Sequence, residues 1–168
     1  MSISSLSVMV IFQISVLGIM ALLLWIQHRS ALVFMKSAMQ RLAGQPFTRL
    51  DVEGLTADTG LAGFSISWQN YELVLVQDSV LFVSYVRWGR FRQYIANYGQ
   101  LYVQGMTVSS VVPKRFSSPI RSAVFKGADL ILTYSMPMGL IELPRTLRLK
   151  GIGNSRNIDT VKRMLRIA

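Results

Sequence analysis

The chain contains no cysteine and only one histidine, His28. Without cysteine there is no disulfide, no thiolate ligand for a metal and no thiol nucleophile, and this absence agrees with a reducing compartment. A single histidine argues against a histidine-based catalytic triad and against a site with several histidine ligands. We therefore expect no metal, no cofactor and no enzymatic activity, and no small-molecule substrate is evident.

Acidic residues are scarce: 8 Asp and Glu stand against 18 Lys and Arg, and the net charge is +10. Asp51 and Glu53 would share one face of a strand, and such a pair is most often a solvated edge or a partner for arginine. The sequence has no P-loop motif. Gly151-Ile152-Gly153 lacks the third glycine and the βαβ setting of a dinucleotide site, so we interpret it as a strand-to-helix turn.

Residues 6–26 carry no charge at all. A helix of these 21 residues, at about 1.5 Å per residue, reaches about 30 Å, which is the thickness of the hydrocarbon core of a bilayer. We predict a transmembrane anchor over residues 1–28. Its anchoring residues include Leu6, Ile11, Leu17, Leu22 and Trp25.

A cleaved signal peptide and a buried soluble helix are the two alternatives to a retained span. A signal peptide would have a basic start, a shorter apolar run and a small-x-small cleavage site, and none of these features precedes or ends the segment. A helix buried in a soluble core would not need an apolar surface around its whole circumference, although Ser7, Gln13 and Ser15 leave that alternative open.

Basic residues set the expected orientation. None precedes the apolar segment, whereas Arg29, Lys36 and Arg41 follow it within about 15 residues, the window in which the positive-inside rule applies. Trp25 lies at the same end, where an indole ring is stable between acyl chains and head groups. We expect a protein of a bacterial-type inner (plasma) membrane, with its N-terminus outside and its C-terminal part in the cytoplasm.

Residues 29–46 are expected to form a juxtamembrane amphipathic helix and a linker. Four apolar residues fall on one arc of such a helix: Leu32, Met35, Met39 and Leu42. Gly44 and Pro46 would end the helix. The apolar arc either docks on the chain's own domain, or it lies in the membrane interface or against a helix of a partner.

Residues 47–168 are expected to form one cytoplasmic β-rich domain, because the sequence changes here to short β-type runs separated by turn residues. Residues 71–77 and 80–88 flank Asp78-Ser79 and predict a hairpin. The other expected strands cover residues 63–68, 101–112, 121–125, 130–135 and 140–149. Short connections without a helical pattern favour an antiparallel meander.

A short amphipathic helix is expected over residues 158–167. Its apolar face comprises Ile158, Val161, Met164 and Leu165. Asn157 can cap its N-terminus. The predicted fold class is α+β: a single N-terminal transmembrane helix, followed by an antiparallel β-sheet or roll closed by a C-terminal helix. In its order of elements this arrangement resembles that of pleckstrin-homology-like domains, which also occur in membrane-anchored bacterial forms.

The predicted hairpin is apolar on both faces. Residues 73–76 and 80–83 are consecutive apolar residues, whereas a strand with one wet face alternates between apolar and polar residues. A second layer must therefore cover the outer face. We expect this layer to be the C-terminal helix or a second sheet of the same domain, with a partner protein or the membrane surface as the alternative.

Two basic and aromatic clusters are candidate sites for contact with lipid or a partner. The first comprises Arg87, Trp88, Arg90, Phe91 and Arg92, continued by Tyr94. The second comprises Lys114, Arg115 and Phe116, with Arg121 nearby. Guanidinium groups pair with phosphate while rings enter the membrane interface. The same composition suits nucleic acid, or a solvated loop whose rings turn into the domain.

Two functions fit these observations. The first is a non-enzymatic single-pass inner-membrane accessory or scaffold subunit, whose basic cytoplasmic domain docks a partner protein or the membrane surface. The second is a membrane-tethered recruiting module that binds anionic lipid or nucleic acid through the two clusters. The expected partners are membrane lipid and other membrane proteins, and nucleic acid is the less favoured partner.

Overall fold

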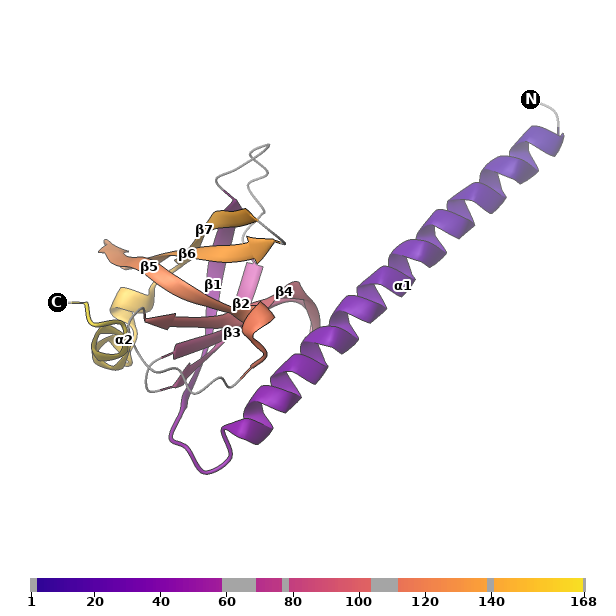
Figure 1. The fold of residues 1–168 in the computed structure, drawn as a ribbon. Coiled ribbons are helices and arrows are strands. Elements are labelled where there is room, and N and C mark those ends of the chain that lie inside the picture. The colour runs from indigo at the N-terminus through magenta and orange to yellow at the C-terminus, as the bar shows by residue number, and fades with distance from the viewer. Residues whose placement is uncertain (1–2, 59–68, 77–78, 104–111, 139–140, 168) are drawn as a thin grey trace.

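The computed structural model describes residues 3–58, 69–76, 79–103, 112–138 and 141–167 (Figure 1). In chain order the elements are α1 (Ile3–Arg41), β1 (Thr48–Asp58), β2 (Gln69–Val76), β3 (Ser79–Trp88), β4 (Phe91–Val103), the 3-10 helix η1 (Lys114–Phe116), β5 (Ser117–Lys126), β6 (Asp129–Met138), β7 (Ile141–Leu149), the 3-10 helix η2 (Ile152–Asn154) and α2 (Ile158–Leu165). The expected α+β class is confirmed. The strand expected over residues 63–68 lies outside the described residues.

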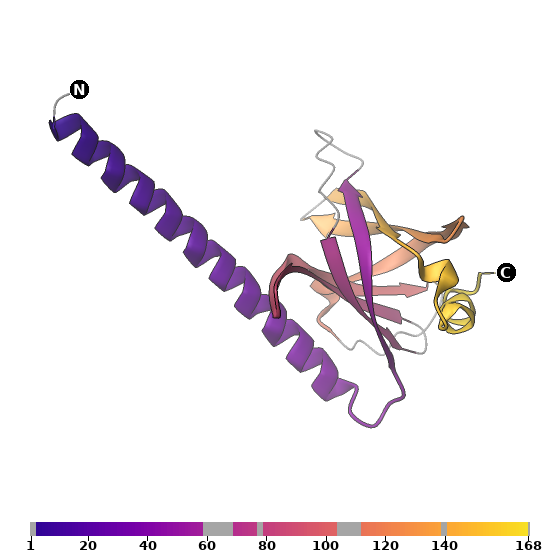
Figure 2. The same ribbon diagram turned by 180° about the vertical axis from the view of Figure 1, so that it is seen from behind.

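α1 is one continuous helix of 39 residues, which is about 58 Å at 1.5 Å per residue. Figures 1 and 2 show that its N-terminal half projects away from the domain, while its C-terminal half lies against the strands. The most apolar 18-residue window has a mean hydropathy of 2.5, and no part of that window is buried. α1 is therefore long and apolar enough to cross a membrane, and it runs without a break past residue 28.

The seven strands close into a barrel because β1 pairs with both β2 and β7. Residues 48–54 are antiparallel to β2, and residues 54–58 are antiparallel to β7. Gly54 is the residue at which the partner changes. A Cβ atom there would lie 2.8 Å from Cδ2 of Tyr71 and 2.9 Å from the backbone oxygen of Arg148, so only glycine fits. The expected sheet or roll of the pleckstrin-homology-like type is thus corrected to a closed barrel.

β4 differs most from the prediction. It begins at Phe91, ten residues before the strand expected from residue 101, because residues 91–98 pair with β3 up to the hairpin turn. β4 then pairs with β5 in parallel, over Gln100–Val103 and Ser117–Ile120. This parallel pair corrects the expectation of an entirely antiparallel meander. The chain has to cross over between the end of β4 and the start of β5, which a hairpin connection cannot do.

The two faces of the β2–β3 hairpin belong to two different cores. Inside the barrel, Leu73 and Phe82 join a core that also contains Val161, Met164 and Leu165 of α2. On the outside, a second core is formed with α1. The covering layer is therefore α1, and the expectation that α2 or a second sheet covers the outer face was wrong: α2 instead packs against the core within the barrel.

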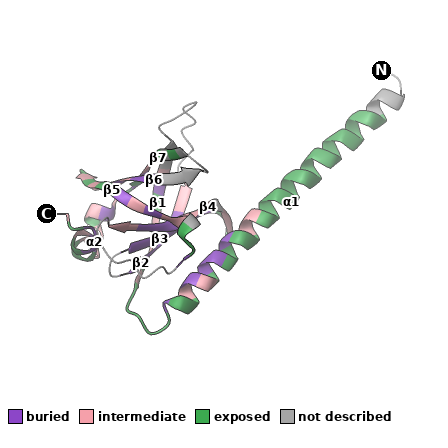
Figure 3. Ribbon diagram, in the orientation of Figure 1, coloured by how far each residue is buried: buried purple, intermediate pink, exposed green. Residues whose placement is uncertain are grey.

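The C-terminal half of α1 docks on the chain's own domain, which was one of the two alternatives for residues 29–46 (Figure 3). The buried residues here are Ala31, Phe34, Met35 and Ala38 of α1, and Leu42 directly after it. They contact Val74, Val76, Leu81 and Val83 of the hairpin. Leu32, expected in the stripe, is 43% exposed. The other three residues of the predicted arc, Met35, Met39 and Leu42, do pack against the barrel, and Ala31, Phe34 and Ala38 extend the contact face.

Candidate functional site

The first basic and aromatic cluster forms the tip of the β3–β4 hairpin, residues 87–92, called the hairpin tip below. Trp88 pairs with Phe91 across the two strands, and Arg87 pairs with Arg92. Gly89, with a φ of +59°, makes the tight turn possible. Trp88 is 66% exposed and Phe91 is 80% exposed. Two large rings thus stand free at the end of a rigid hairpin.

The hairpin tip lies beside α1 at the end of its apolar stretch. Trp88 and Phe91 border a shallow hollow of about 510 Å³, whose other wall is α1. The residues that α1 contributes to this hollow are Ala21, Leu24, Trp25 and His28. The exposed rings and the last apolar turns of α1 are therefore at the same level along the helix axis.

His28 connects the hairpin to α1. The backbone N–H of Tyr94 donates a hydrogen bond to Nδ1 of His28 at 3.0 Å, and the two rings are stacked with their centroids 5.8 Å apart. Nδ1 accepts this bond, so the proton of the neutral imidazole is on Nε2. The start of β4 is thus fixed to α1 by both a polar and a stacking contact.

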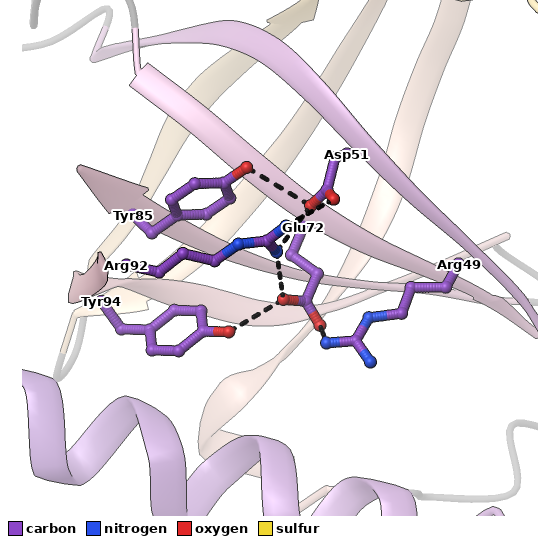
Figure 4. A network of polar contacts seen from close by, with 6 residues as sticks. All are labelled: Arg49, Asp51, Glu72, Tyr85, Arg92 and Tyr94. Carbon is purple, nitrogen blue, oxygen red and sulfur yellow. Dashed lines mark hydrogen bonds and ion pairs between the residues drawn. The ribbon is translucent and has the colours of Figure 1, made fainter. Parts of the chain in front are cut away.

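Arg92 differs from the other arginines of the hairpin tip because carboxylates of the barrel bind its guanidinium (Figure 4). Its two terminal nitrogens bind the two carboxylate oxygens of Asp51, at 3.0 and 2.9 Å, a bidentate arrangement. Its guanidinium also lies 4.8 Å from the ring centroid of Tyr85 and 3.4 Å from Oε2 of Glu72. The structure thus leaves Arg87 and Arg90 exposed and uses Arg92 to join β4 to β1 and β2.

Glu72 is the buried centre of this network. Its side chain has no exposed surface, it faces Asp51 across the β1–β2 pair, and it forms ion pairs with Arg49 and Arg92. The hydroxyl of Tyr94 donates a hydrogen bond to Oε2 of Glu72 at 2.9 Å. Burial, followed by this hydrogen bond to a carboxylate, raises the pKa of the Tyr94 hydroxyl.

The pKa of the Tyr85 hydroxyl, on the neighbouring strand β3, is raised for similar reasons. Burial and the nearby charge of Asp51 raise the pKa of its hydroxyl, which donates a hydrogen bond of 3.3 Å to that carboxylate. Both tyrosines thus stay protonated as donors to carboxylates. A continuous series of polar contacts therefore begins at His28 of α1 and ends at Asp51 on β1. It passes through Tyr94, Glu72 and Arg92.

The described side chains of the second cluster do not form one surface. Lys114 is exposed, but the ring of Phe116 packs against two other rings. Its centroid lies 5.8 Å from that of Phe34 on α1 and 5.4 Å from that of Tyr98. Arg121 is bound to Glu142 at 2.9 Å. The side chain of Arg115 lies outside the described residues. Phe116 thus belongs to the contact between helix and barrel, as in the interpretation of a loop whose rings turn inward.

A groove runs between α1 and the barrel next to this cluster. Its volume is about 470 Å³, and no acidic residue is among its lining residues. It is lined by Trp25, Ile26, Arg29, Ser30, Val33, Phe34 and Ser37 of α1, and by Tyr98, Val112, Pro113 and Phe116 of the barrel side. We call it the helix groove. Trp25 borders both the helix groove and the hollow at the hairpin tip.

Of the anchoring residues named from the sequence, Ile11, Leu17, Leu22 and Trp25 are 55–66% exposed on the free half of α1. The side chain of Leu6 is outside the described part. Glu72 and its partner Arg49 were missed by sequence reasoning. The available signal was a lone carboxylate followed by four apolar residues in β2, since such a charge needs a partner when its strand is buried.

Asp51 has the expected arginine partner, Arg92, whereas Glu53 binds a lysine, Lys150, at 3.2 Å. Within the described ranges, no three His, Cys, Asp or Glu residues come together as a candidate metal site. Comparisons with protein-family models, with curated proteins and with solved structures find no match to this chain.

Proposed function

We propose that this chain is a non-enzymatic, single-pass accessory protein of a bacterial-type inner membrane. α1 anchors it, its barrel lies in the cytoplasm, and the hairpin tip docks on the surface of the same membrane. The accessory role consists in holding a basic domain at a fixed position against the leaflet, where it is available to other membrane proteins. The alternative considered from the sequence is a recruiting module that binds anionic lipid or nucleic acid, and of these two ligands we favour membrane lipid.

One observation carries this proposal: Trp88 and Phe91 lie at the same level along the axis of α1 as its residues Ala21, Leu24 and Trp25. If residues 6–26 span the bilayer, these two rings reach the boundary between acyl chains and head groups. Tryptophan and other amphipathic rings are enriched at that depth. Two neighbouring large rings that are 66% and 80% exposed mark a surface that contacts a membrane or a partner.

Charge supports the same orientation. Arg87 and Arg90 are exposed beside the two rings, and Arg29 is exposed on α1 just past the apolar stretch. Each Arg or Lys near an anionic leaflet contributes about 1 kcal/mol of attraction. Nucleic acid is less favoured, because a tip that is seated in the membrane surface has its rings unavailable for stacking on bases.

The fixed connection between helix and barrel supports a docked domain over a freely tethered one. Ala31 and Ala38 of α1 are fully buried against the barrel, and His28 binds the start of β4. Since α1 is continuous from the apolar stretch to Arg41, the barrel cannot turn independently of the anchor. α1 thus brings the hairpin tip to the membrane boundary, where the charges and rings of the tip decide how deeply it is seated.

The test uses Trp88 as the only tryptophan, by the substitutions Trp25→Phe and Trp68→Phe in the full chain, reconstituted in lipid nanodiscs. We expect lipids brominated near the head group to quench Trp88, and we expect water-soluble acrylamide to quench it weakly. The matched control removes all three native tryptophans and carries Val124→Trp on β5, where the native side chain is 56% exposed. Acrylamide should quench this control strongly. Equal quenching of both proteins by acrylamide would refute the docking.

A further inference from the structure

We infer that the helix groove binds one acyl chain of a membrane phospholipid, whose phosphate is held by Arg29. This inference rests on the membrane anchoring in the proposed function, and it concerns a different surface from the hairpin tip. The groove begins at Trp25 and Ile26, the last apolar residues of the anchor, and it continues along α1 to Ser37. A lipid of the cytoplasmic leaflet therefore has direct access to its open end.

The walls of the groove suit a hydrocarbon chain. Its floor consists of three rings in mutual contact. The ring centroids of Phe34 and Tyr98 are 4.7 Å apart, and that of Phe116 lies within 5.8 Å of both. The α1 wall leaves apolar side chains open to it, including Val33, which is 62% exposed although it lies beyond the apolar anchor. Exposed apolar surface in a concave position marks a binding site.

The length of the groove suits one acyl chain. From Trp25 to Ser37 the groove extends about 18 Å at 1.5 Å per residue. One chain that crosses a leaflet is about 15 Å long, which matches the groove.

Charge at the open end points to phosphate. The guanidinium of Arg29 lies 5.3 Å from the ring centroid of Trp25, which holds it at the rim, and Lys114 is exposed next to the lining residue Pro113. Among the described residues that line the groove, none is a carboxylate that would oppose an anion. A phosphate at Arg29 would be at the membrane boundary, so one chain of the lipid can stay in the leaflet while the other enters the groove.

The test is photo-crosslinking of the full chain in nanodiscs that contain a trace of phospholipid with a diazirine at the end of one acyl chain. After digestion, mass spectrometry locates the labelled residues. We expect label on the anchor, residues 6–26, and a second set of labels on Val33, Ser37 or Tyr98. These three residues are outside the anchor, and only a chain that leaves the leaflet reaches them.

Two neighbouring substitutions give the matched control. Val33→Trp fills the groove and should reduce its labelling several-fold without affecting the anchor, whereas Leu32→Trp, on an exposed residue that does not line the groove, should leave both sets unchanged. Arg29→Gln should also reduce groove labelling, and Arg29→Lys should restore it.

The outcomes separate the two proposals. Label on the anchor with none in the groove would overturn the lipid site and leave the anchoring intact. Groove labelling that is unaffected by Val33→Trp, or equally reduced by Leu32→Trp, would also overturn the site. Groove labelling that does not depend on residue 29 would refute the phosphate contact. Absence of label from the anchor itself would refute the membrane anchoring, and the inference with it.

Discussion

The backbone N–H of Tyr94 is hydrogen-bonded to Nδ1 of His28 at 3.0 Å, which joins the first residues of β4 to the turn of α1 that follows its apolar stretch. The remaining contacts between α1 and the barrel are mainly apolar and lie further along the helix, from Ala31 to Leu42. His28 is therefore the polar contact nearest to the hairpin tip. If the tip docks on a membrane, this bond keeps it at its depth.

We predict that His28→Ala loosens the hairpin while the barrel stays folded. The substitution removes an acceptor whose bond contributes about 0.5–1.5 kcal/mol, so the Tyr94 amide should exchange its hydrogen faster than in the parent protein. His28→Asn is the matched control, because its side-chain oxygen can take the position of Nδ1. Hydrogen exchange followed by mass spectrometry of the β4 peptide measures the exchange rate in both variants. Equal exchange in the parent and His28→Ala would contradict the prediction.

The two carboxylates that face each other across β1 and β2 should differ in their effect on stability. Glu72 is fully buried with three polar partners, so Glu72→Gln should lower stability by about 1.5–3 kcal/mol, the range for hydrogen bonds to a charged group. Asp51 is 47% exposed, and Asp51→Asn should cost less than about 1 kcal/mol. Thermal unfolding of the full chain in detergent ranks the two variants. The reverse order would refute Glu72 as the centre of the network.

Local patterns in the sequence were sufficient for the elements that are formed by neighbouring residues. The β2–β3 hairpin, the amphipathic juxtamembrane half of α1 and α2 were predicted because each follows from periodicity and turn residues within a short window. Barrel closure was not predicted, since it pairs Gly54 with Leu149, nearly the whole domain apart in sequence. Only the crowding at Gly54 indicates the change of partner, and crowding is a property of the folded chain.

The candidate site was predictable in its location more than in the roles of its residues. Contiguous basic and aromatic residues identified the hairpin tip, and the structure keeps Trp88 and Phe91 exposed there. The sequence could not show that Arg92 has a different role, because its partners Asp51 and Glu72 come from β1 and β2. The helix groove likewise depends on how closely α1 approaches the barrel. A local sequence pattern does not predict that distance.

The arginines of the hairpin tip should therefore divide into two groups. Arg87→Glu with Arg90→Glu should leave the fold intact, because both side chains are exposed, and should move Trp88 out of anionic nanodiscs. The same change should have little effect at high salt, where the charges are screened. Quenching of Trp88 by brominated lipid, as a function of salt, provides the measurement. Unchanged quenching at low salt would exclude these two arginines from lipid contact.

Adding Arg92→Glu to that double variant should instead damage the fold. A third carboxylate would then stand beside Asp51 and Glu72, and like charges in a partly buried site destabilise it. We expect a Tm clearly below that of the double variant, measured in detergent. An unchanged Tm would show that the ion pairs of Arg92 do not stabilise the barrel.

Asp129 should give the barrel a component of stability that is lost in acid. A hydrogen bond of 3.1 Å from the backbone N–H of Gly151, and then one of 2.8 Å from Nε of Arg148, lower the pKa of Asp129 below its ordinary value of 3.8. A carboxylate with a lowered pKa in the folded state stabilises the fold above its ordinary value, and this stabilisation disappears as pH falls through the lowered value. We expect Asp129→Asn to reduce Tm at neutral pH and to differ less from the parent in acid. A difference independent of pH would contradict this.

The orientation of the anchor can be tested with the natural lack of cysteine, since a single introduced thiol is then the only target for a maleimide. Arg29, Lys36 and Arg41 follow the apolar stretch and no basic residue precedes it, so the barrel should face the cytoplasm. With a membrane-impermeant maleimide on intact spheroplasts, Ser4→Cys should be labelled. Val124→Cys, at a position that is 56% exposed in the native barrel, should be labelled only after the membrane is opened. Labelling of Val124→Cys in intact spheroplasts would place the barrel outside and remove the anionic cytoplasmic leaflet as the surface that the hairpin tip contacts.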